Sequence, residues 1–265
     1  MAVTTPSASI SSAVESTRPR ALFVHAHPDD ESLWTGGTIA RHVALGGHAD
    51  LVMCTWADGT WRQLELADAA RELGLPRPPI ALGYADENVP ESAPGAPRFC
   101  AAPFDEPVGA LVSHIRRLQP EVLVTYDAFG IYGHPDHIHA HRVAAVAADA
   151  AGSARLFPSA GEAWQVKSIY FVTIAQWMVD DVAADVMAGT PRKYLPGAPE
   201  HEIDLVLDVS AWRDRKAAAV SAHRTELKRS RTMQALMAMP PERRDRLFGT
   251  ECFIRRDLVA GGADL

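Results

Sequence analysis

Short apolar runs alternate along the chain with longer segments whose apolar residues recur at helical spacing. The apolar runs, which we expect to form strands, are residues 21–26, 48–55, 80–82, 121–126 and 166–173. The helical patterns cover residues 32–45, 64–73, 106–118 and 136–151, and glycine follows the first two. Alternation of this kind predicts an α/β, Rossmann-like fold in which helices flank a mostly parallel sheet.

The pattern is less regular in the C-terminal third of the chain. Glycine and prolines interrupt residues 176–202, where we expect a loop-rich insertion with at most one short helix. Helices are expected at 210–230 and 240–247. Because of the interrupted segment before them, the C-terminal portion as a whole is expected to be loop-rich. Residues 1–19 are expected to be a flexible tail, and residues 20–265 a single domain without an internal linker.

Composition excludes several classes of partner. The 265 residues include 33 acidic and 26 basic side chains, and the net charge of −7 gives no reason to expect a nucleic acid or an anionic membrane. No apolar run reaches the roughly 20 residues of a membrane span, and residues 2–17 lack the pattern of a secretory signal. Three cysteines without CxxC spacing favour a reducing cytoplasm. We expect a cytoplasmic protein that acts on a small molecule. The protein could form a homo-oligomer.

Two polar clusters follow two of the predicted strands. His25-Ala26-His27-Pro28-Asp29-Asp30-Glu31 comes at the end of the first strand, and His134-Pro135-Asp136-His137 comes shortly after residues 121–126. Ligands of open α/β sheets bind outside the carboxyl ends of the strands, so both clusters are expected at that edge. Imidazole nitrogen and carboxylate oxygen suit a divalent ion such as zinc. The two clusters therefore predict a mononuclear metal hydrolase.

The spacing suggests which side chains would bind the ion. Because Pro28 turns the chain, His27 and Asp30 can meet, and His137 can join them if the two strands are neighbours. Two imidazoles and one carboxylate leave a fourth position open for water, as a catalytic zinc requires. Asp29, which adjoins a ligand but is itself free, is the expected general base.

Other interpretations of these residues remain open. Asp29, Asp30 or Ser32 could simply cap a helix. His137 and His141 have the i,i+4 spacing of known zinc pairs, with His139 then pointing to solvent. His25 shares a strand face with His27 and could orient a ligand from behind.

The segments AHPDDE (Ala26 to Glu31) and GHPDH (Gly133 to His137) resemble the paired signatures of the PIG-L (LmbE-like) family of zinc-dependent N-deacetylases. The resemblance extends from the first strand to Phe253 and points in particular to the actinobacterial branch with the mycothiol-pathway deacetylase. It implies a zinc site of His27, Asp30 and His137 with Asp29 as the general base. It also implies that a protonated His134 assists the transition state and that Tyr132 helps to polarise the substrate carbonyl.

The resemblance extends to residues that would contact a sugar. Arg62, in Arg62-Gln63-Leu64-Glu65-Leu66, matches an arginine that holds the sugar or its substituent, and Asp86 matches an aspartate that binds glucosamine hydroxyls. Arg62 could equally be a solvated charge at the start of a helix, and Asp86 could equally be a turn residue. Many relatives continue after this aspartate with Ser-Gly-Met, whereas here Glu87-Asn88-Val89 follows. Residues 85–105 are expected to form a long surface loop beside the pocket.

Two further features bear on the pocket. His223 lies in a segment that resembles a pocket element of relatives, but Glu226 replaces their usual glutamine, which leaves the role of His223 open. Trp164 and Trp177 lie near or in the irregular region and could stack on a sugar, although tryptophan is more often packed core.

The expected function is therefore a zinc-dependent hydrolase that removes an N-acetyl or other N-acyl group from an N-acetylglucosamine-containing conjugate, in natural-product or thiol-sugar biosynthesis. Fe²⁺ or Co²⁺ could occupy the same ligands. Two alternatives remain: an amidase that cleaves a larger amide, and a noncatalytic metal- or sugar-binding protein. A free carboxylate at Asp29 argues against the binding protein, which has no need of a base beside the metal.

Overall fold

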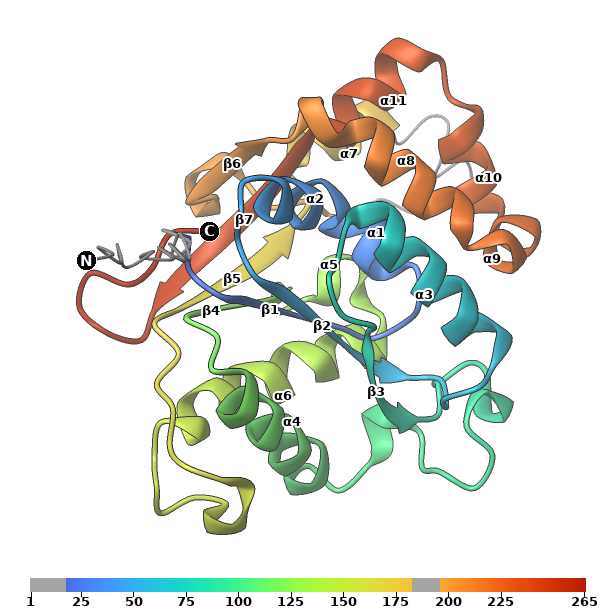
Figure 1. Ribbon diagram of the computed structural model, residues 1–265. Coiled ribbons are helices and arrows are strands. Elements are labelled where there is room, and N and C mark those ends of the chain that lie inside the picture. The colour runs from blue at the N-terminus through green and yellow to red at the C-terminus, as the bar shows by residue number, and fades with distance from the viewer. Residues whose placement is uncertain (1–17, 183–195) are drawn as a thin grey trace, which may run out of the picture.

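The computed structural model describes residues 18–182 and 196–265. Within these ranges seven strands form a single sheet in the order β3-β2-β1-β4-β5-β7-β6 (Figure 1). The strands are β1 (Ala21–His25), β2 (Ala49–Thr55), β3 (Ile80–Tyr84), β4 (Val122–Tyr126), β5 (Ser168–Thr173), β6 (Leu205–Asp208) and β7 (Thr250–Asp257). Strands β1 to β5 are parallel, and β7 runs antiparallel to both β5 and β6. The predicted α/β class with a mostly parallel sheet is confirmed.

Helices cover both faces of this sheet. In Figure 1, α4 and α6 lie on one face, and α1, α2, α3 and α8 lie on the other. The helices are α1 (Asp30–Trp34), α2 (Gly36–Ala44), α3 (Trp61–Leu73), α4 (Asp105–Leu118), α5 (Gly130–Gly133), α6 (Pro135–Ala151), α7 (Gln176–Val182), α8 (Arg213–Ala222), α9 (Arg224–Arg229), α10 (Arg231–Ala238) and α11 (Pro241–Phe248). Because they are covered on both sides, β1, β2, β4 and β5 are buried along their whole length.

The strand order places the two polar clusters at neighbouring positions. Strand β1 pairs with β2 on one side and with β4 on the other, with Phe23 opposite both Leu51 and Val124. The strand order therefore reverses between β1 and β4, and a crevice at such a switch point is where α/β sheets bind ligands. The sequence analysis required these two strands to be neighbours, and in the structure they pair directly.

Two predicted helices are interrupted in the structure. The expected helix 32–45 divides at Thr35, whose hydroxyl bonds the Glu31 carbonyl (3.2 Å) and His25 Nε2 (2.8 Å). The expected helix 210–230 contains a short 3₁₀ turn and then divides at His223 (φ −79°, ψ 61°). Both breaks coincide with side-chain hydrogen bonds, local ones at Thr35 and a long-range one from His223 to Glu31, which the spacing of apolar positions does not record.

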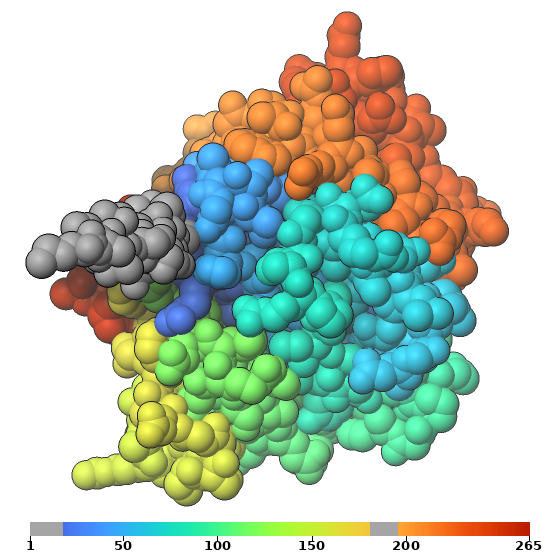
Figure 2. Space-filling view, in the orientation of Figure 1, coloured from blue at the N-terminus to red at the C-terminus, as the bar shows by residue number. Residues whose placement is uncertain are grey.

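The C-terminal portion is more regular than expected. Strands β6 and β7 and helix α10 were not predicted, and Ser230 starts α10 by accepting a bond from the Met233 N–H (3.2 Å). Figure 2 shows the C-terminal helices (orange to red) packed directly against the N-terminal half (blue to cyan), consistent with contacts of α8 with α2 and α3. The division into a 1–19 tail and one domain stays a prediction, since residues 1–17 lie outside the described ranges.

None of the helices in the described ranges is long and apolar enough to cross a membrane. The expected surface loop 85–105 contains two short 3₁₀ turns and a bridge between Ala85 and Arg98, and its Phe99 side chain is fully buried. This loop is therefore anchored to the core beside the carboxyl ends of the strands.

Candidate metal centre and active site

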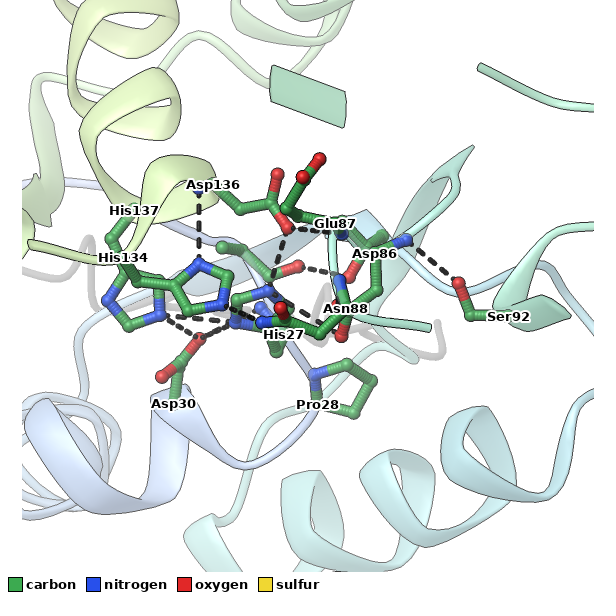
Figure 3. A network of polar contacts seen from close by, with 12 residues as sticks. His27, Pro28, Asp30, Asp86, Glu87, Asn88, Ser92, His134, Asp136 and His137 are labelled. Atoms are coloured by element: carbon green, nitrogen blue, oxygen red, sulfur yellow. Dashed lines mark hydrogen bonds and ion pairs between the residues drawn. The ribbon is translucent and has the colours of Figure 1, made fainter. Parts of the chain in front are cut away.

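Three donor atoms converge where β1 and β4 end (Figure 3). His27 Nδ1 lies 3.2 Å from Asp30 Oδ2 and 3.1 Å from His137 Nε2, and the last two atoms are 3.3 Å apart. Ligand atoms around a tetrahedral zinc ion with bonds of about 2.0–2.1 Å stand roughly 3.3–3.4 Å from one another. The spacing of these three donors therefore fits one small divalent ion.

The local structure explains this convergence. After β1 the chain turns at Pro28, and the Asp30 carboxylate folds back to accept the His27 backbone N–H (2.8 Å) as α1 begins. His137 lies in the first turn of α6, which follows β4 after a short connection. The two segments meet because their strands pair directly.

The two imidazoles are oriented for coordination. His27 Nε2 lies 3.1 Å from Asp136 Oδ2, and His137 Nδ1 lies 3.2 Å from the Gly130 carbonyl oxygen. Each ring donates its one N–H to one of these acceptors. The other ring nitrogens, His27 Nδ1 and His137 Nε2, therefore carry lone pairs, which point toward Asp30. Bonds of this kind behind metal-binding histidines fix the tautomer and the ring orientation. The donor chemistry thus agrees with the spacing.

Two residues of this centre were missed by the sequence reasoning. The buried Tyr126 hydroxyl donates to Asp30 Oδ2 (2.7 Å) and accepts the Ala26 N–H (2.7 Å). Asp136 is fully buried, and it accepts bonds from the backbone N–H groups of Glu87 (2.9 Å) and Cys100 (3.1 Å) as well as from His27. The signals were the position of Tyr126 as the last residue of a strand and of Asp136 inside GHPDH.

Other groupings of side chains at this edge are less suited to a metal. His134 lies close enough to His27 and His137 to complete one set, and a second set combines His27 and His134 with Asp86 and Asp136. The second set would use His27 Nε2, which lies 3.7 Å from Asp86 Oδ2 and already faces Asp136. His134 Nδ1 is also engaged, since it accepts the Asp136 backbone N–H at 3.2 Å.

The remaining histidines lie away from the centre. His139 was expected to face solvent, but it is buried against Phe99 and Phe104, so that expectation is wrong. His141 Nδ1 bonds the Tyr126 carbonyl oxygen (2.8 Å), and His25 bonds the Thr35 hydroxyl. His25 therefore reaches the centre only through its edge contact with the Tyr126 ring.

Asp29 adopts an unusual conformation beside the three donors. Its φ of +126° is rare for a residue with a side chain, and the Asp29 N–H donates to Glu31 Oε2 (3.0 Å). Its carboxylate faces the Arg62 guanidinium at 3.3 Å. Burial raises the pKa of Asp29 to about 7, against the opposing charge of Arg62. A carboxylate with such a pKa is suited to take up a proton near neutral pH.

A buried ion pair between His223 and Glu31 supports the turn at Asp29. His223 Nε2 lies 2.7 Å from Glu31 Oε1, and both side chains are fully buried. Burial alone would raise the pKa of Glu31 and lower that of His223, but each partner reverses the shift, so the Glu31 pKa is lowered and the His223 pKa is raised. His223 thus joins the α8–α9 junction to the Asp29 turn, which is a supporting position behind the pocket.

The two expected sugar contacts occupy different settings. Arg62 is buried, lies over the Trp56 ring (5.1 Å), and contacts Glu226 and the Pro28 carbonyl as well as Asp29. Its guanidinium is thus already engaged by the protein. Asp86 is 6% exposed, and its Oδ1 accepts the Asn88 N–H (2.7 Å). Both line the cavity, and their roles toward a sugar stay predictions.

His134 and Tyr132 border the same space. Burial, with the neighbouring His27 and His137, lowers the pKa of His134 to about 4. The protonated state that the resemblance implies stays a prediction. Tyr132 is partly exposed and lies in α5, where Ile131 has a φ of +66°. Gly130 (φ +65°) is required there because a Cβ would lie 2.6 Å from His137 Cβ.

These residues open into one cavity of about 550 Å³, within the range of small-molecule sites. Its polar lining includes His27, Asp29, Arg62, Asp86, Tyr132 and His134, together with Lys216, Glu226, Arg229 and Glu251. Its apolar lining, here called the apolar end, includes Val172, Ile174, Met178, Met233, Leu236 and Phe248. Trp34 lines the cavity. Trp164 and Trp177 are not among its lining residues, and Trp164 instead donates to the Pro120 carbonyl (2.7 Å).

Comparisons with known proteins identify the family of this chain. A family model for PIG-L, described as GlcNAc-PI de-N-acetylase, matches residues 22–148. The 1D-myo-inositol 2-acetamido-2-deoxy-alpha-D-glucopyranoside deacetylase of Rhodococcus jostii (strain RHA1) is 40% identical over 240 residues, which cover 78% of this chain and 82% of the relative. The conserved protein TT1542 of Thermus thermophilus superimposes with a TM-score of 0.63 and 26% identity, covering 91% of this chain and 95% of that chain.

The fold alone does not determine the reaction. The 4-carboxy-2-hydroxymuconate hydratase GalB of Pseudomonas putida KT2440 has a similar structure, with a TM-score of 0.58 and 18% identity over 93% of this chain and 100% of that chain. The family match is more specific, because its range, residues 22–148, includes both polar segments of the candidate metal centre. Together these findings show that the chain is an enzyme of the PIG-L deacetylase family.

Proposed function

We propose that this enzyme is a metal-dependent hydrolase that removes the N-acetyl group from an N-acetylglucosamine-containing conjugate. The observation that carries the proposal is the convergence of His27, Asp30 and His137 beside the Asp29 carboxylate, which is not one of the three donors, at a cavity that His27, Asp29 and Asp30 line. The names of the family model and of the Rhodococcus relative support the choice of an acetylated amino sugar.

His27, Asp30 and His137 would hold the metal. Two nitrogens and one oxygen at this spacing suit zinc, and Fe²⁺ or Co²⁺ accept the same donors. A bound divalent ion supplies Lewis-acid activation of water and of the acyl carbonyl. Tyr126 and Asp136 fix the Asp30 carboxylate and the His27 ring in position for that role.

Asp29 would take the proton from the attacking water. It adjoins a ligand, yet its carboxylate turns toward Arg62 and is not one of the three converging donors, so it remains available as a base. The bond between the carbonyl carbon and the sugar nitrogen then breaks, and the departing amine takes up a proton. Asp29, which has gained one, is in a position to return it.

His134 and Tyr132 would stabilise the negative charge that develops on the carbonyl oxygen. His134 Nδ1 accepts the Asp136 N–H, so Nε2 carries the ring proton and can donate it without the ring being charged. Tyr132 lines the same cavity and presents a phenol donor.

The cavity supports a conjugate larger than a monosaccharide. Arg62 and Asp86 line the same cavity as His27 and Asp30, where an acetylated sugar would bind, and the apolar end provides further lining. Inositol-linked sugars, thiol sugars and natural-product intermediates are the candidate conjugates. The apolar end also favours, as a second candidate, cleavage of an amide with a larger acyl group. The three free cysteines agree with a cytoplasmic setting.

The test is release of acetate from a panel of N-acetylglucosamine conjugates by the zinc-reconstituted protein. Asp29→Asn serves as the matched control, since it keeps the size of the side chain and removes the base. Acetate released by the native protein alone supports the proposal. Zinc bound at one equivalent without acetate from any acetylated sugar contradicts it, and release of a longer acid from N-acyl analogues would select the amidase.

A further inference from the structure

Helix α1 carries one of the converging donors and a tryptophan on the same face. Asp30 and Trp34 are four residues apart in this helix, and the Trp34 indole N–H donates to Asp30 Oδ1 (3.1 Å). The other oxygen of this carboxylate, Oδ2, is the one that converges with His27 and His137. The indole of Trp34 therefore lies directly beside the candidate metal centre.

The Trp34 ring is held in place without being covered. It packs at a tilt of 37° against the Tyr132 ring, with 6.4 Å between the ring centroids, a spacing typical of aromatic pairs. This contact and the bond to Asp30 fix the ring at two points. Trp34 is nevertheless only partly buried, and it lines the cavity, which Trp164 and Trp177 do not. An aromatic ring of fixed orientation thus forms part of the cavity wall beside the metal centre.

The chemistry of an acetylated amino sugar places its ring at this wall. When the acetyl carbonyl reaches the metal centre, the sugar must follow closely, because only the amide nitrogen separates the carbonyl carbon from the sugar carbon. Most ring substituents of glucosamine are equatorial, so the faces of its ring present C–H groups. Such a face packs against an indole with a gain in dispersion and a loss of exposed apolar surface. The hydroxyls at the edge of the sugar ring remain free for polar lining residues such as Asp86.

We propose that Trp34 is the platform on which the sugar ring of the substrate stacks. The inference rests on the proposed function and deepens it, because it names a side chain that recognises the sugar itself, apart from the acetyl group and the aglycone. Trp34 then acts in substrate binding and not in the chemical step. The stacking that the sequence suggested for Trp164 or Trp177 is assigned to a different tryptophan.

A comparison of Trp34→Phe with Trp34→Leu tests this role. Both variants lose the N–H bond to Asp30, so any effect of that bond on the metal is common to them, and they differ in the aromatic face. For methyl N-acetylglucosaminide we expect KM in Trp34→Leu to exceed that in Trp34→Phe about 3- to 10-fold, the contribution of one aromatic contact, with kcat equal within about twofold. Trp61→Leu is the control, because Trp61 is exposed on α3 and does not line the cavity. It should match the native protein.

A binding measurement keeps the inference independent of turnover. Methyl glucosaminide, the deacetylated product, is added to the zinc-loaded protein, and the proton spectrum of the sugar is followed. Stacking on an indole shifts sugar C–H signals upfield through the ring current. We expect this shift with the native protein and with Trp61→Leu, and we expect it to disappear in Trp34→Leu.

Several results would overturn the proposal. They are the absence of sugar binding, binding without an upfield shift, a shift that persists in Trp34→Leu, and equal KM values for Trp34→Phe and Trp34→Leu. The two proposals fail in different ways. An upfield shift that depends on Trp34, without acetate release from any conjugate, would remove the proposed function and keep the platform. Acetate release without the shift would do the reverse.

Discussion

Asp136 offers a sharp test of how the protein prepares the metal site. Its carboxylate accepts three N–H groups, from His27, Glu87 and Cys100, and the Asp136 side chain is itself fully buried. Asp136→Asn keeps the shape but turns one of the two oxygens into an NH₂ group, which meets an N–H donor whichever way it faces.

We expect zinc affinity to fall about 10- to 100-fold in Asp136→Asn, because loss of a partner behind a ligand costs that much in other metal sites. This range corresponds to about 1.4–2.7 kcal/mol of binding free energy. The assay is competition for zinc against a chromophoric chelator, with the fold checked by circular dichroism. Asp149→Asn, an exposed carboxylate on the same helix, serves as the control. A folded Asp136→Asn protein with affinity within twofold of the native value would refute the reasoning.

Four further predictions concern the His223–Glu31 pair, Gly130 and the cavity lining. His223→Ala should destabilise the metal-free protein by about 3–5 kcal/mol in urea unfolding, because Glu31 is left buried without its counter-charge; a loss under about 1 kcal/mol would show that the pair is dispensable. Since Glu31 raises the pKa of His223 and His223 lowers that of Glu31, this stabilisation should be complete between pH 4.5 and 6.5, the ordinary pKa values of the two groups. It should fade as pH rises through the raised His223 value or falls through the lowered Glu31 value, which native-minus-variant unfolding curves at several pH values would detect. Gly130→Ala should fold but bind zinc weakly, because the new methyl group displaces His137; unchanged zinc binding by calorimetry would contradict the assigned geometry. An octyl N-acetylglucosaminide should exceed the methyl glycoside in kcat/KM by about tenfold or more, since each methylene buried in the apolar end contributes about 0.8 kcal/mol. Equal kcat/KM values for the two glycosides would show that the octyl chain does not bind in the apolar end.

The sequence predicted which side chains meet at the candidate metal centre, and the reason is physical. His27, Asp30 and His137 each follow a buried apolar strand, and the carboxyl ends of parallel strands lie at one edge of a sheet. The remaining condition was that β1 and β4 be adjacent, and the structure meets it. The local polar pattern therefore contained most of the information about which side chains meet.

The pattern of apolar and polar positions could not predict the contacts that hold the centre in place. The Tyr126 hydroxyl reaches Asp30, and Asn88 reaches His134, across long separations in the chain. Such bonds depend on register and on loop path, which leave no periodic signal. The break at His223 has the same origin, since the helix ends where its ring turns toward Glu31.

Strand β7 was missed for a different reason. Its sequence, from Thr250 to Asp257, mixes apolar residues with Glu251, Arg255 and Arg256 and shows no clear alternation. Glu251 points inward, where it accepts the backbone N–H groups of Gly37 (2.8 Å) and Thr38 (2.9 Å) and pairs with the buried Lys216 (2.7 Å). A charge that is satisfied only by tertiary contacts hides the strand from a pattern of hydrophobic positions.

The most direct test of the account is a zinc titration of the metal-free protein followed by the rate of acetate release from the best conjugate of the panel. The account predicts that activity rises linearly to one equivalent of zinc and then stays level, and that His137→Ala gains no activity at that ratio. Full activity before zinc is added, or an unimpaired His137→Ala protein, would contradict it.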